Sequence, residues 1–366
     1  MKLRGIGALA AVIAASMAVA ACGSSSSSTS TPSSGSSGTT TAAASSGGAK
    51  SLTGAGSTLV APLVSDWTPA YQSAKGVSLT YGAIGSGGGI KQISARTVDF
   101  GASDAPMTTS QATSCNGCVE IPWALAATVI AYHVQGVPNH LKLTGPVLAD
   151  IWMGKIKTWD DPAIKALNPG VSLPSTAITP VHRTDGSGDT YAFSNYLSQV
   201  SPTFKSSVGG PSTLVNWPGG LGGKGNSGVG GVLASTNGAI AYIAIAYVFA
   251  NNFDYALVQN AAGQYPVPGV PSISAAAAAV TNVPSGGTGG ISIVNPPKSA
   301  AGAYPISTFT YVLVPKMSKS TSVATALQTF IGWAITTGQS YGPKLQFAPL
   351  PVAVVSADQQ TLKLLQ

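Results

Sequence analysis

Histidine and cysteine are rare in this chain, and their scarcity argues against several kinds of site. The 366 residues include three of each, and His133, His140 and His182 are scattered along the sequence. Zinc sites need Cys and His ligands at close, regular spacing, and serine hydrolases need a histidine base beside the nucleophile. We therefore expect no metal, no cofactor and no enzymatic activity, with a hydrolase as an alternative.

Charged residues and long apolar runs are also in short supply. Asp, Glu, Lys and Arg together make up 8% of the chain, and no basic run interleaved with aromatic residues marks a nucleic-acid surface. The apolar run from Ala239 to Ala250 is far shorter than the roughly 20 residues of a spanning helix, so we expect a buried strand. The net charge of +7 is mild support for an anionic ligand or environment.

The N-terminus has the pattern of an export signal. Lys2 and Arg4 precede an apolar and small-residue run from Ile6 to Ala21, which is too short and too alanine-rich for a membrane span. Two alanines then precede Cys22, as in bacterial lipoprotein signals. We expect residues 1–21 to be removed and Cys22 to be lipidated, which would anchor the protein to the outer face of the cytoplasmic membrane. An ordinary secretory signal with a chance cysteine is the alternative, and it also predicts export.

Residues 23–50 consist almost entirely of Ser, Thr, Gly and Ala. They include no aromatic and no branched aliphatic residue, so they cannot bury enough surface to offset the entropy of ordering the chain. We expect residues 22–50 to form a flexible tether between the lipid and a folded body. The body that follows, about 316 residues, is long enough for two domains.

Two cysteines remain, and only two residues separate Cys115 from Cys118. In an exported protein such a pair forms a disulfide more often than half of a metal site, and the sequence has no second half-site. We expect a disulfide between Cys115 and Cys118 that closes a small turn. A redox-active C-x-x-C motif is the alternative, and nothing else in the sequence favours it.

The folded body alternates helical and strand periodicities, which predicts an α/β architecture. Pro69 should kink or end the first helix. Segments rich in Gly, Pro and Ser at 208–231 and 281–304 are expected to be long loops. The expected helices cover residues 59–71, 147–153 and 323–334, and the expected strands cover 77–81, 98–102 and 127–132.

Three glycine-bearing turns with Ser or Thr directly precede helical patterns, at residues 54–59, 85–90 and 185–190. Glycine lets the backbone approach an anion, and the free N–H groups in the first turn of a helix attract it. One such turn is usually only a helix cap. Three of them in one chain favour an anion-binding site.

Two kinds of charged side chain refine this hypothesis. Arg183 offers a planar guanidinium suited to oxyanions, and Asp185 could pair with it and hold it in place. Asp104 would repel an anion unless that anion carries a proton to donate. At neutral pH this condition selects phosphate over sulfate, although a receptor for sulfate or another oxyanion remains the alternative.

Six segments resemble the periplasmic phosphate-binding proteins of bacterial ABC importers, the PstS family. They follow the family's order over nearly the whole body, and they are SLTGAGSTLVAPL from Ser51, IGSGGGIKQI from Ile84, TVDFGASDAPM from Thr97, IWMGKIKTWDDPAI from Ile151, VHRTDGSGDT from Val181 and YPISTFTYVLV from Tyr304. The resemblance implies a two-lobed α/β fold of the periplasmic-binding-protein (Venus-flytrap) kind, type II-like. It implies lobes of 51–132 plus 304–366 and of 133–303, which close over one phosphate.

The resemblance also implies which groups bind the ligand and where the ligand goes. Phosphate would pass to the membrane permease subunits of an ABC importer, with no nucleic-acid partner. Leu59 stands where an aromatic residue is common, which should be harmless because its amide does the binding. The implied phosphate ligands are Thr58, the amide of Leu59, Ser86, Asp104 as proton acceptor, Arg183, Ser187 and Gly188.

Asp189 departs from the family pattern, because many members have Thr at this position. If its carboxylate faces the ligand, it could accept a second proton, and we include Asp189 among the candidate phosphate-binding residues. The alternative is that Asp189 points away from the anion and stabilises the first turn of its helix.

Overall fold

The computed structural model of the chain describes residues 49–280, 283, 286–287 and 290–366, which belong to one compact unit. The expected signal peptide, the expected lipidation site Cys22 and nearly all of the expected tether lie outside the described residues. In the part that the structure describes, we find no helix long and apolar enough to cross a membrane.

A mixed sheet forms the centre of the fold. Its strands are β1 (Ser51–Gly56), β2 (Ser78–Ala83), β3 (Phe100–Ser103), β4 (Cys118–His133), β6 (Thr179–Arg183), β7 (Leu221–Gly223), β8 (Ala239–Ala244), β9 (Asp254–Tyr255) and β11 (Ser307–Pro315). Their order is β2-β1-β3-β11-β4-β8-β6-β7, and β9 pairs with β4 beside this path. β5 (Lys142–Leu143) and β10 (Leu257–Val258) form a separate two-stranded sheet. The parallel strands fall into two groups, β1 to β3 and β6 to β8.

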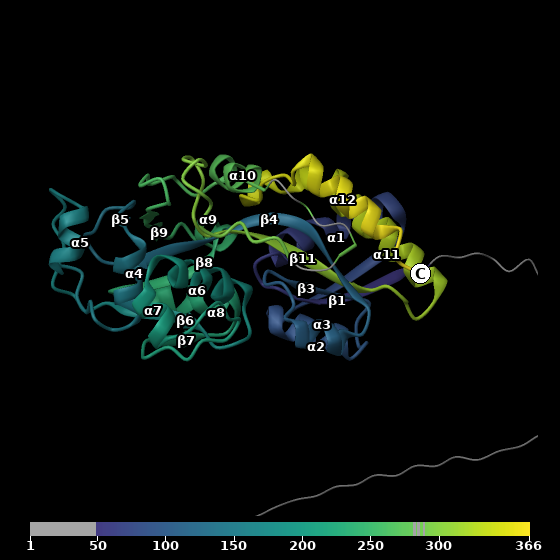
Figure 1. The fold of residues 1–366 in the computed structure, drawn as a ribbon, viewed down its shortest axis with the longest axis horizontal. Coiled ribbons are helices and arrows are strands. Elements are labelled where there is room, and N and C mark those ends of the chain that lie inside the picture. Colours follow the sequence, from purple (N-terminus) through teal and green to yellow (C-terminus); the bar gives the residue numbers. More distant parts are fainter. Residues whose placement is uncertain (1–48, 281–282, 284–285, 288–289) are drawn as a thin grey trace, which may run out of the picture. The chain divides into compact units, whose positions relative to one another are not determined.

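The long strand β4 joins these two groups. Its first part, Cys118 to Ala127, pairs with β11, which in turn pairs with β3. Its second part, Thr128 to His133, pairs with β8. The result is a two-lobed α/β fold in which β4 and β11 run between the lobes (Figure 1). We call the part around β1, β2 and β3 lobe I and the part around β6, β7 and β8 lobe II.

Helices cover both faces of the sheet in lobe I. Figure 1 shows α11 and α12 on one side of β1 and β3, and α2 and α3 on the other. The helices of this lobe are α1 (Ala61–Lys75), α2 (Ser86–Ser94), α3 (Thr109–Cys115), α11 (Thr321–Ala334) and α12 (Val352–Leu362). Strand β1 leads directly into α1 and β2 into α2, so both helices begin at the carboxyl ends of parallel strands.

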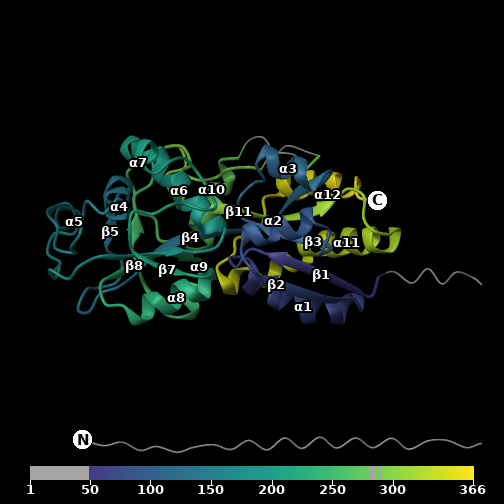
Figure 2. The same cartoon turned by 90° about the horizontal axis from the view of Figure 1, so that it is seen from below.

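Lobe II repeats this plan, as seen from below in Figure 2. Its helices are α4 (Gly145–Trp152), α5 (Pro162–Leu167), α6 (Gly188–Val200), α7 (Pro202–Ser207), α8 (Gly225–Ser235) and α9 (Ile245–Ala250), and α10 (Val270–Ala278) packs against β4 and β11. Strand β6 leads into α6 and β7 into α8. Ligands of open α/β sheets bind outside the carboxyl ends of the strands, so this edge is where a site is expected.

Helix α1 shows how core packing overrides a local signal. It continues through Pro69 to Lys75, so the expected end at Pro69 is wrong. Trp67 and Tyr71 flank the proline and are fully buried, and the Trp67 indole donates to the Gly338 carbonyl at 2.8 Å. Burying these two aromatic side chains contributes about 1.5–3 kcal/mol each, which offsets the cost of about 3 kcal/mol for a proline inside a helix.

Most of the other expected elements are confirmed, and two are wrong in part. The structure confirms the expected helices in α1, α4 and α11, and the expected strands in β2, β3 and β4. The run Ala239–Ala250 is a strand only as far as Ala244, because helix α9 starts at Ile245. The segment 208–231 is not a continuous loop, since it contains β7 and most of α8. The described residues of 281–304 form neither helix nor strand, as expected.

Cys115 and Cys118 are joined by a disulfide at the end of α3, with their Cα atoms 5.5 Å apart. Asn116 between them adopts a left-handed conformation with a φ of 42°. The Arg96 guanidinium donates to the carbonyl oxygens of Cys115 and Asn116 at 3.0 and 2.9 Å. The arginine therefore ties this turn to the end of α2.

Candidate functional site

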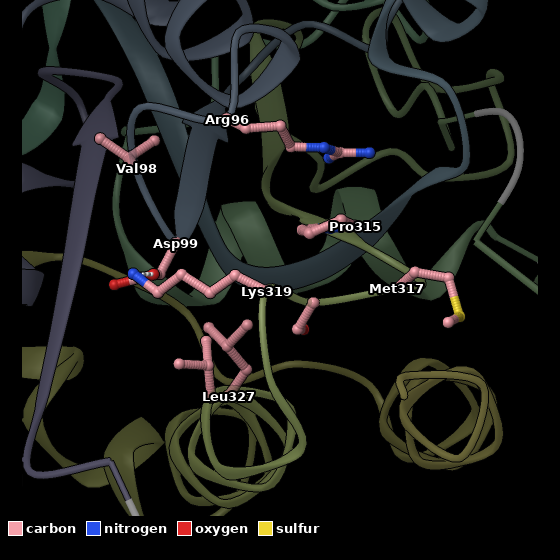
Figure 3. Close-up of a pocket in the computed structure, with 9 residues that line it drawn as sticks. Arg96, Val98, Asp99, Pro315, Met317, Lys319 and Leu327 are labelled. Carbon is pink, nitrogen blue, oxygen red and sulfur yellow. Dashed lines mark ion pairs between the residues drawn. The ribbon is translucent and has the colours of Figure 1, made fainter.

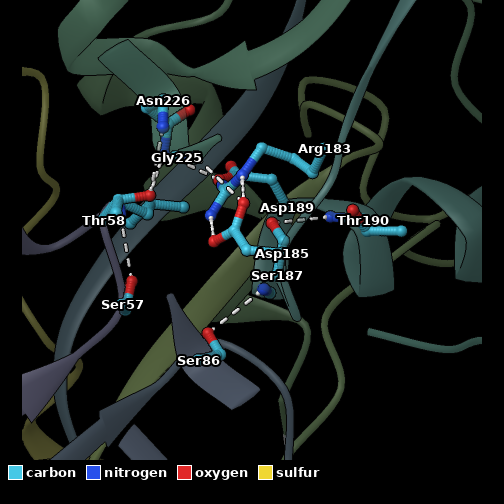
Figure 4. A network of polar contacts seen from close by, with 12 residues as sticks. Ser57, Thr58, Ser86, Arg183, Asp185, Ser187, Asp189, Thr190, Gly225 and Asn226 are labelled. Atoms are coloured by element: carbon cyan, nitrogen blue, oxygen red, sulfur yellow. Dashed lines mark hydrogen bonds and ion pairs between the residues drawn. The ribbon is translucent and has the colours of Figure 1, made fainter. Parts of the chain in front are cut away.

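The three glycine turns meet at the boundary between the lobes (Figure 4). The turn at 54–59 joins β1 to α1, the turn at 85–90 starts α2, and the turn at 185–190 joins β6 to α6. The Gly87 amide donates to the Gly186 carbonyl at 2.9 Å, and the Gly188 amide donates to the Ser86 hydroxyl at 3.1 Å. Turns from both lobes are therefore in direct contact.

Two glycines make this close approach possible. Gly188 packs directly against Asp104, and a Cβ atom at position 188 would overlap the Asp104 carboxylate. Gly85 has a φ of 87°, and a Cβ atom there would overlap the Asp185 carboxylate. A side chain at either position would therefore require the facing carboxylate or the nearby backbone to move.

Arg183, the last residue of β6, is 4% exposed and held by two carboxylates. Its Nε donates to Asp185 Oδ1 at 2.8 Å and its Nη2 to Asp185 Oδ2 at 2.5 Å. Its Nη1 donates to Asp189 Oδ2 at 3.0 Å. Although burial opposes ionisation of Asp185, these contacts with Arg183 hold the pKa of its carboxyl below the usual value. The bidentate pair fixes the plane of the guanidinium.

Asp104, which follows β3, is almost fully buried, and no cation in the described part of the chain forms an ion pair with it. Its Oδ2 accepts from the hydroxyls of Ser57 at 2.7 Å and Ser86 at 3.3 Å. Its Oδ1 is buried and has no hydrogen-bond partner among the described residues. Burial, and then the negative charge of Asp189, raise the pKa of Asp104 to about 7, while the Ser57 hydroxyl opposes this rise. Asp104 can therefore hold or release a proton near neutral pH.

Asp189 lies in the first turn of α6, and its side chain points inward. Its Oδ1 accepts from the Thr128 hydroxyl at 2.8 Å, and its Oδ2 accepts from Arg183 and from Asn226 Nδ2 at 3.0 and 2.9 Å. Burial raises the pKa of Asp189, and the Arg183 guanidinium opposes that rise. The carboxylate is fully buried and bonds to side chains from three different elements, so it does more than stabilise its own helix end.

The remaining predicted site residues lie in the same cluster, with their hydrogen bonds partly directed to neighbours. The Thr58 hydroxyl accepts from Asn226, and the Leu59 amide donates to the Ser57 hydroxyl at 3.0 Å. The Ser187 hydroxyl caps α6 by accepting from the Thr190 amide at 3.2 Å. The structure thus brings all eight candidate ligands and Asp185 together at one point between the lobes.

Sequence reasoning missed four residues of this cluster: Ser57, Thr128, Gly225 and Asn226. Gly225 donates its amide to Asp185 Oδ1 at 2.9 Å, and Asn226 bonds to Thr58 and Asp189. Both begin α8, and the glycine-bearing turn Gly222-Gly223-Lys224 leads into this helix, as glycine-bearing turns do at the three helices identified. That turn could have been used to predict Gly225 and Asn226 as site residues. Thr128 lies within an apolar strand and had none.

A pocket of about 190 Å³ lies on lobe I away from this cluster (Figure 3). Its lining is largely apolar and includes Val98, Met317 and Leu327. The charged side chains of this pocket already have partners within the protein: Lys319 forms an ion pair with Asp99 at 2.6 Å, and Arg96 bonds to the disulfide turn. We therefore assign the candidate site to the cluster between the lobes.

The comparisons with known proteins agree with this geometry. Residues 38–337 match the family model of the PBP superfamily domain. A phosphate-binding protein PstS of Xylella fastidiosa is 42% identical over 305 residues, which cover 83% of this chain and 82% of the relative. The PstS protein of Pasteurella multocida is 37% identical over 316 residues, which cover 86% of this chain and 90% of that protein.

Solved structures agree in fold. A high-affinity periplasmic phosphate-binding protein, PfluDING, bound with phosphate, superposes with a TM-score of 0.68 at 20% identity, covering 84% of this chain and 92% of that one. A phosphate-binding protein from Stenotrophomonas maltophilia gives a TM-score of 0.65 at 18% identity, covering 84% and 93%. The two-lobed fold, the family model and the sequence identity lead to one conclusion: the chain belongs to the PBP superfamily and, within it, to the PstS family of phosphate-binding proteins.

Proposed function

We propose that this protein captures inorganic phosphate between its two lobes and delivers it to the permease subunits of an ABC-type importer. The observation that supports this most strongly is the Asp104 carboxylate, with one buried oxygen lacking a partner among the described residues, in the same cluster as the Arg183 guanidinium. The guanidinium and the surrounding N–H groups suit an oxyanion. A carboxylate acceptor beside them suits only an oxyanion that carries a proton, which phosphate does at neutral pH and sulfate does not.

The proposed ligand set joins donors from both lobes. Asp104 accepts the proton of the ligand, Arg183 contributes a charged fork, and Asp185 orients that fork. Asp104 and Arg183 are buried, so each of these interactions is stronger than it would be in water. The proposed phosphate-binding residues are Thr58, the amide of Leu59, Ser86, Asp104, Arg183, Ser187, Gly188 and Asp189.

The proposal includes closure of the lobes and export of the protein. The proposed lobes are 51–132 plus 304–366 and 133–303, and the change of β4 from β11 to β8 at Thr128 supports a hinge near the first crossing. The lipoprotein-type pattern that ends in Cys22 supports a lipid-anchored receptor outside the cytoplasmic membrane.

A binding role, without turnover, is proposed. The pattern Gly338-Gln339-Ser340-Tyr341-Gly342 resembles a hydrolase nucleophile elbow, but that motif places the serine on a strand-to-helix turn. Here Ser340 lies in a 3-10 helix at 337–341 and donates to the Thr337 carbonyl at 2.8 Å. Within the part of the chain described, no histidine bonds to a side chain of the cluster between the lobes, and His182 Nδ1 lies 3.3 Å from the backbone carbonyl of Arg183.

Calorimetric titration of the purified body, from about residue 49 onward, tests the proposal. We expect one phosphate per chain, much weaker binding of sulfate, and a more compact particle by small-angle scattering when phosphate is saturating. Equal affinity for sulfate would remove the selectivity argument based on Asp104. An unchanged scattering curve at saturation would contradict closure, and no binding of phosphate would contradict the proposed function itself.

A further inference from the structure

Asn226 is a fully buried polar residue that belongs to neither the implied ligand set nor the core. It lies in the first turn of α8, next to the site (Figure 4). Its Nδ2 donates to Thr58 Oγ1 at 2.8 Å and to Asp189 Oδ2 at 2.9 Å. Its backbone amide donates to the same Thr58 oxygen at 3.3 Å. One residue of lobe II therefore contacts a site residue of each lobe.

The orientation of the Asn226 amide is fixed by a backbone group. The Ala244 amide donates to Asn226 Oδ1 at 2.9 Å, and a backbone N–H can only donate. The oxygen of Asn226 must therefore face Ala244, which leaves the NH₂ group facing Thr58 and Asp189. A flipped amide would place two donors against each other and two acceptors against each other.

This orientation determines the state of the Thr58 hydroxyl. A hydroxyl has two acceptor lone pairs and one O–H donor, and the two N–H groups of Asn226 occupy both lone pairs. Thr58 can then form further hydrogen bonds only as a donor. A hydroxyl restricted in this way offers its proton to an acceptor oxygen of the ligand and cannot accept from a protonated one.

We infer that Asn226 is a positioning residue that makes Thr58 a donor only and links the two lobes around the ligand. This inference rests on the proposed function. It assigns complementary tasks to two residues of lobe I, since Thr58 donates to an unprotonated oxygen while Asp104 accepts from a protonated one. The same turn of α8 supports the cation of the site, because the neighbouring Gly225 amide donates to Asp185.

A double-mutant cycle on the phosphate dissociation constant tests the inference. The variants are Asn226→Ala, Thr58→Val and their combination. If Asn226 acts through Thr58, Asn226→Ala weakens binding roughly 10- to 100-fold in the wild-type background but no more than about 5-fold in the Thr58→Val background. The residual loss reflects the contact between Asn226 and Asp189.

Thr128→Val is the matched control, because Thr128 also donates to Asp189 and forms no hydrogen bond with Thr58 in the described structure. Its effect should be the same, within about 2-fold, with Thr58 or Val at position 58. Thermal unfolding of each variant separates loss of binding from loss of folding. If Asn226→Ala does not fold, Asn226→Asp replaces it in the cycle, since it keeps an acceptor for the Ala244 amide and removes both side-chain donations.

Each outcome decides between the alternatives. Coupling at position 226 without coupling at position 128 supports the inference. Equal losses from Asn226→Ala in both backgrounds would overturn it and leave the proposed function intact. Failure of the wild-type protein to bind phosphate would overturn the proposed function, and this inference with it.

Discussion

Two buried carboxylates of the candidate site, Asp104 of lobe I and Asp189 of lobe II, have opposite surroundings. Asp189 accepts from a guanidinium, an amide and a hydroxyl, so both of its oxygens are occupied. Asp104 accepts from two serine hydroxyls on one oxygen, while its other oxygen has no partner within the described residues. Both side chains are almost completely shielded from solvent.

The difference indicates how one protein can use the same side chain for two tasks. A carboxylate beside a buried cation compensates that cation and fixes its position. A carboxylate buried without a cation is destabilised as a charge, and its pKa rises until it exchanges protons near neutral pH. On the lobe II side of the site, Asp189 is therefore part of an ion-pair network. On the lobe I side, Asp104 is suited to accept a proton.

The largest expected effect is on stability without phosphate, where the two carboxylates should respond with opposite signs. Asp189→Asn should lower the free energy of unfolding by about 3–5 kcal/mol, because it removes one partner of a buried ion pair. Asp104→Asn should raise it by about 1–3 kcal/mol at pH values above about 7, because it removes a buried charge that forms no ion pair with a cation of the described residues. Denaturant unfolding at several pH values measures both.

The sign of the pH effect follows from the pKa of Asp104, which burial raises from 3.8 to about 7. The unfolded chain loses this proton at lower pH than the folded protein, so the contribution of Asp104 to stability falls as pH rises between about 4 and about 7. The increase in the free energy of unfolding caused by Asp104→Asn should therefore be absent near pH 4 and complete above about pH 7. Two variants that destabilise equally at every pH would contradict the contrast between the carboxylates.

The next effect in size concerns Arg183, the cation that Asp185 and Asp189 hold. Arg183→Ala should weaken phosphate binding by about 2–5 kcal/mol, because it removes one partner of a buried charged hydrogen bond. Calorimetry measures this loss directly. Arg96→Ala is the matched control: its guanidinium bonds to the disulfide turn outside the site, so the affinity should change by less than about 2-fold. An unchanged affinity in Arg183→Ala would remove Arg183 from the site.

Selectivity should separate the two carboxylates further. Asp104→Asn replaces an acceptor by an amide that can donate to an unprotonated oxygen, so sulfate binding should improve relative to phosphate by roughly 10-fold, about 1.4 kcal/mol. The ratio of the two dissociation constants is the measurement. Asp99→Asn makes the same substitution at a buried residue outside the site, where the partner is Lys319, and it should leave that ratio unchanged.

The smallest expected effect addresses the second proton that Asp189 could accept. If Asp189 accepts a proton from the ligand as well as holding Arg183, affinity should fall as pH rises through the second ionisation of phosphate. Asp189→Thr should then retain its affinity a few-fold better than the wild type at a pH of about 8–9, with the gap narrowing near about pH 6. If the affinities of the two proteins depend on pH in the same way, Asp189 accepts no proton from the ligand, and its role is to hold Arg183.

Local patterns predicted those elements of the fold whose residues alternate between core and solvent. The spacing of Leu63, Trp67 and Tyr71 predicted α1 because one face of that helix is buried. The run Ala239–Ala250 is buried on all sides, so it has no periodicity to separate β8 from α9. Helix α8 was missed because its glycines are poor helix formers, and its formation depends on packing of Val229 and Leu233 in the core.

In the candidate site, too, local patterns predicted some residues and missed others. Arg183, Ser187 and Gly188 belong to one short segment, so a local motif was enough to find them. The contacts of Asn226 join residues that are 168 and 37 positions away in the chain, and no local pattern encodes such a distance. The surroundings of Asp189 were equally out of reach, because Thr128 comes from a strand whose other residues are apolar.

Strand β4 is shared between the lobes, and this has a consequence for how the protein unfolds. Each lobe completes its sheet with a different part of the same strand. If one lobe unfolds and β4 unfolds with it, the strand next to β4 in the other lobe loses its hydrogen-bond partners. A single calorimetric transition is expected, although aromatic side chains group separately around Trp67 and around Trp152. The slowest amide hydrogens to exchange should lie in β4 on both sides of Thr128, since their release requires the cooperative loss of the whole fold.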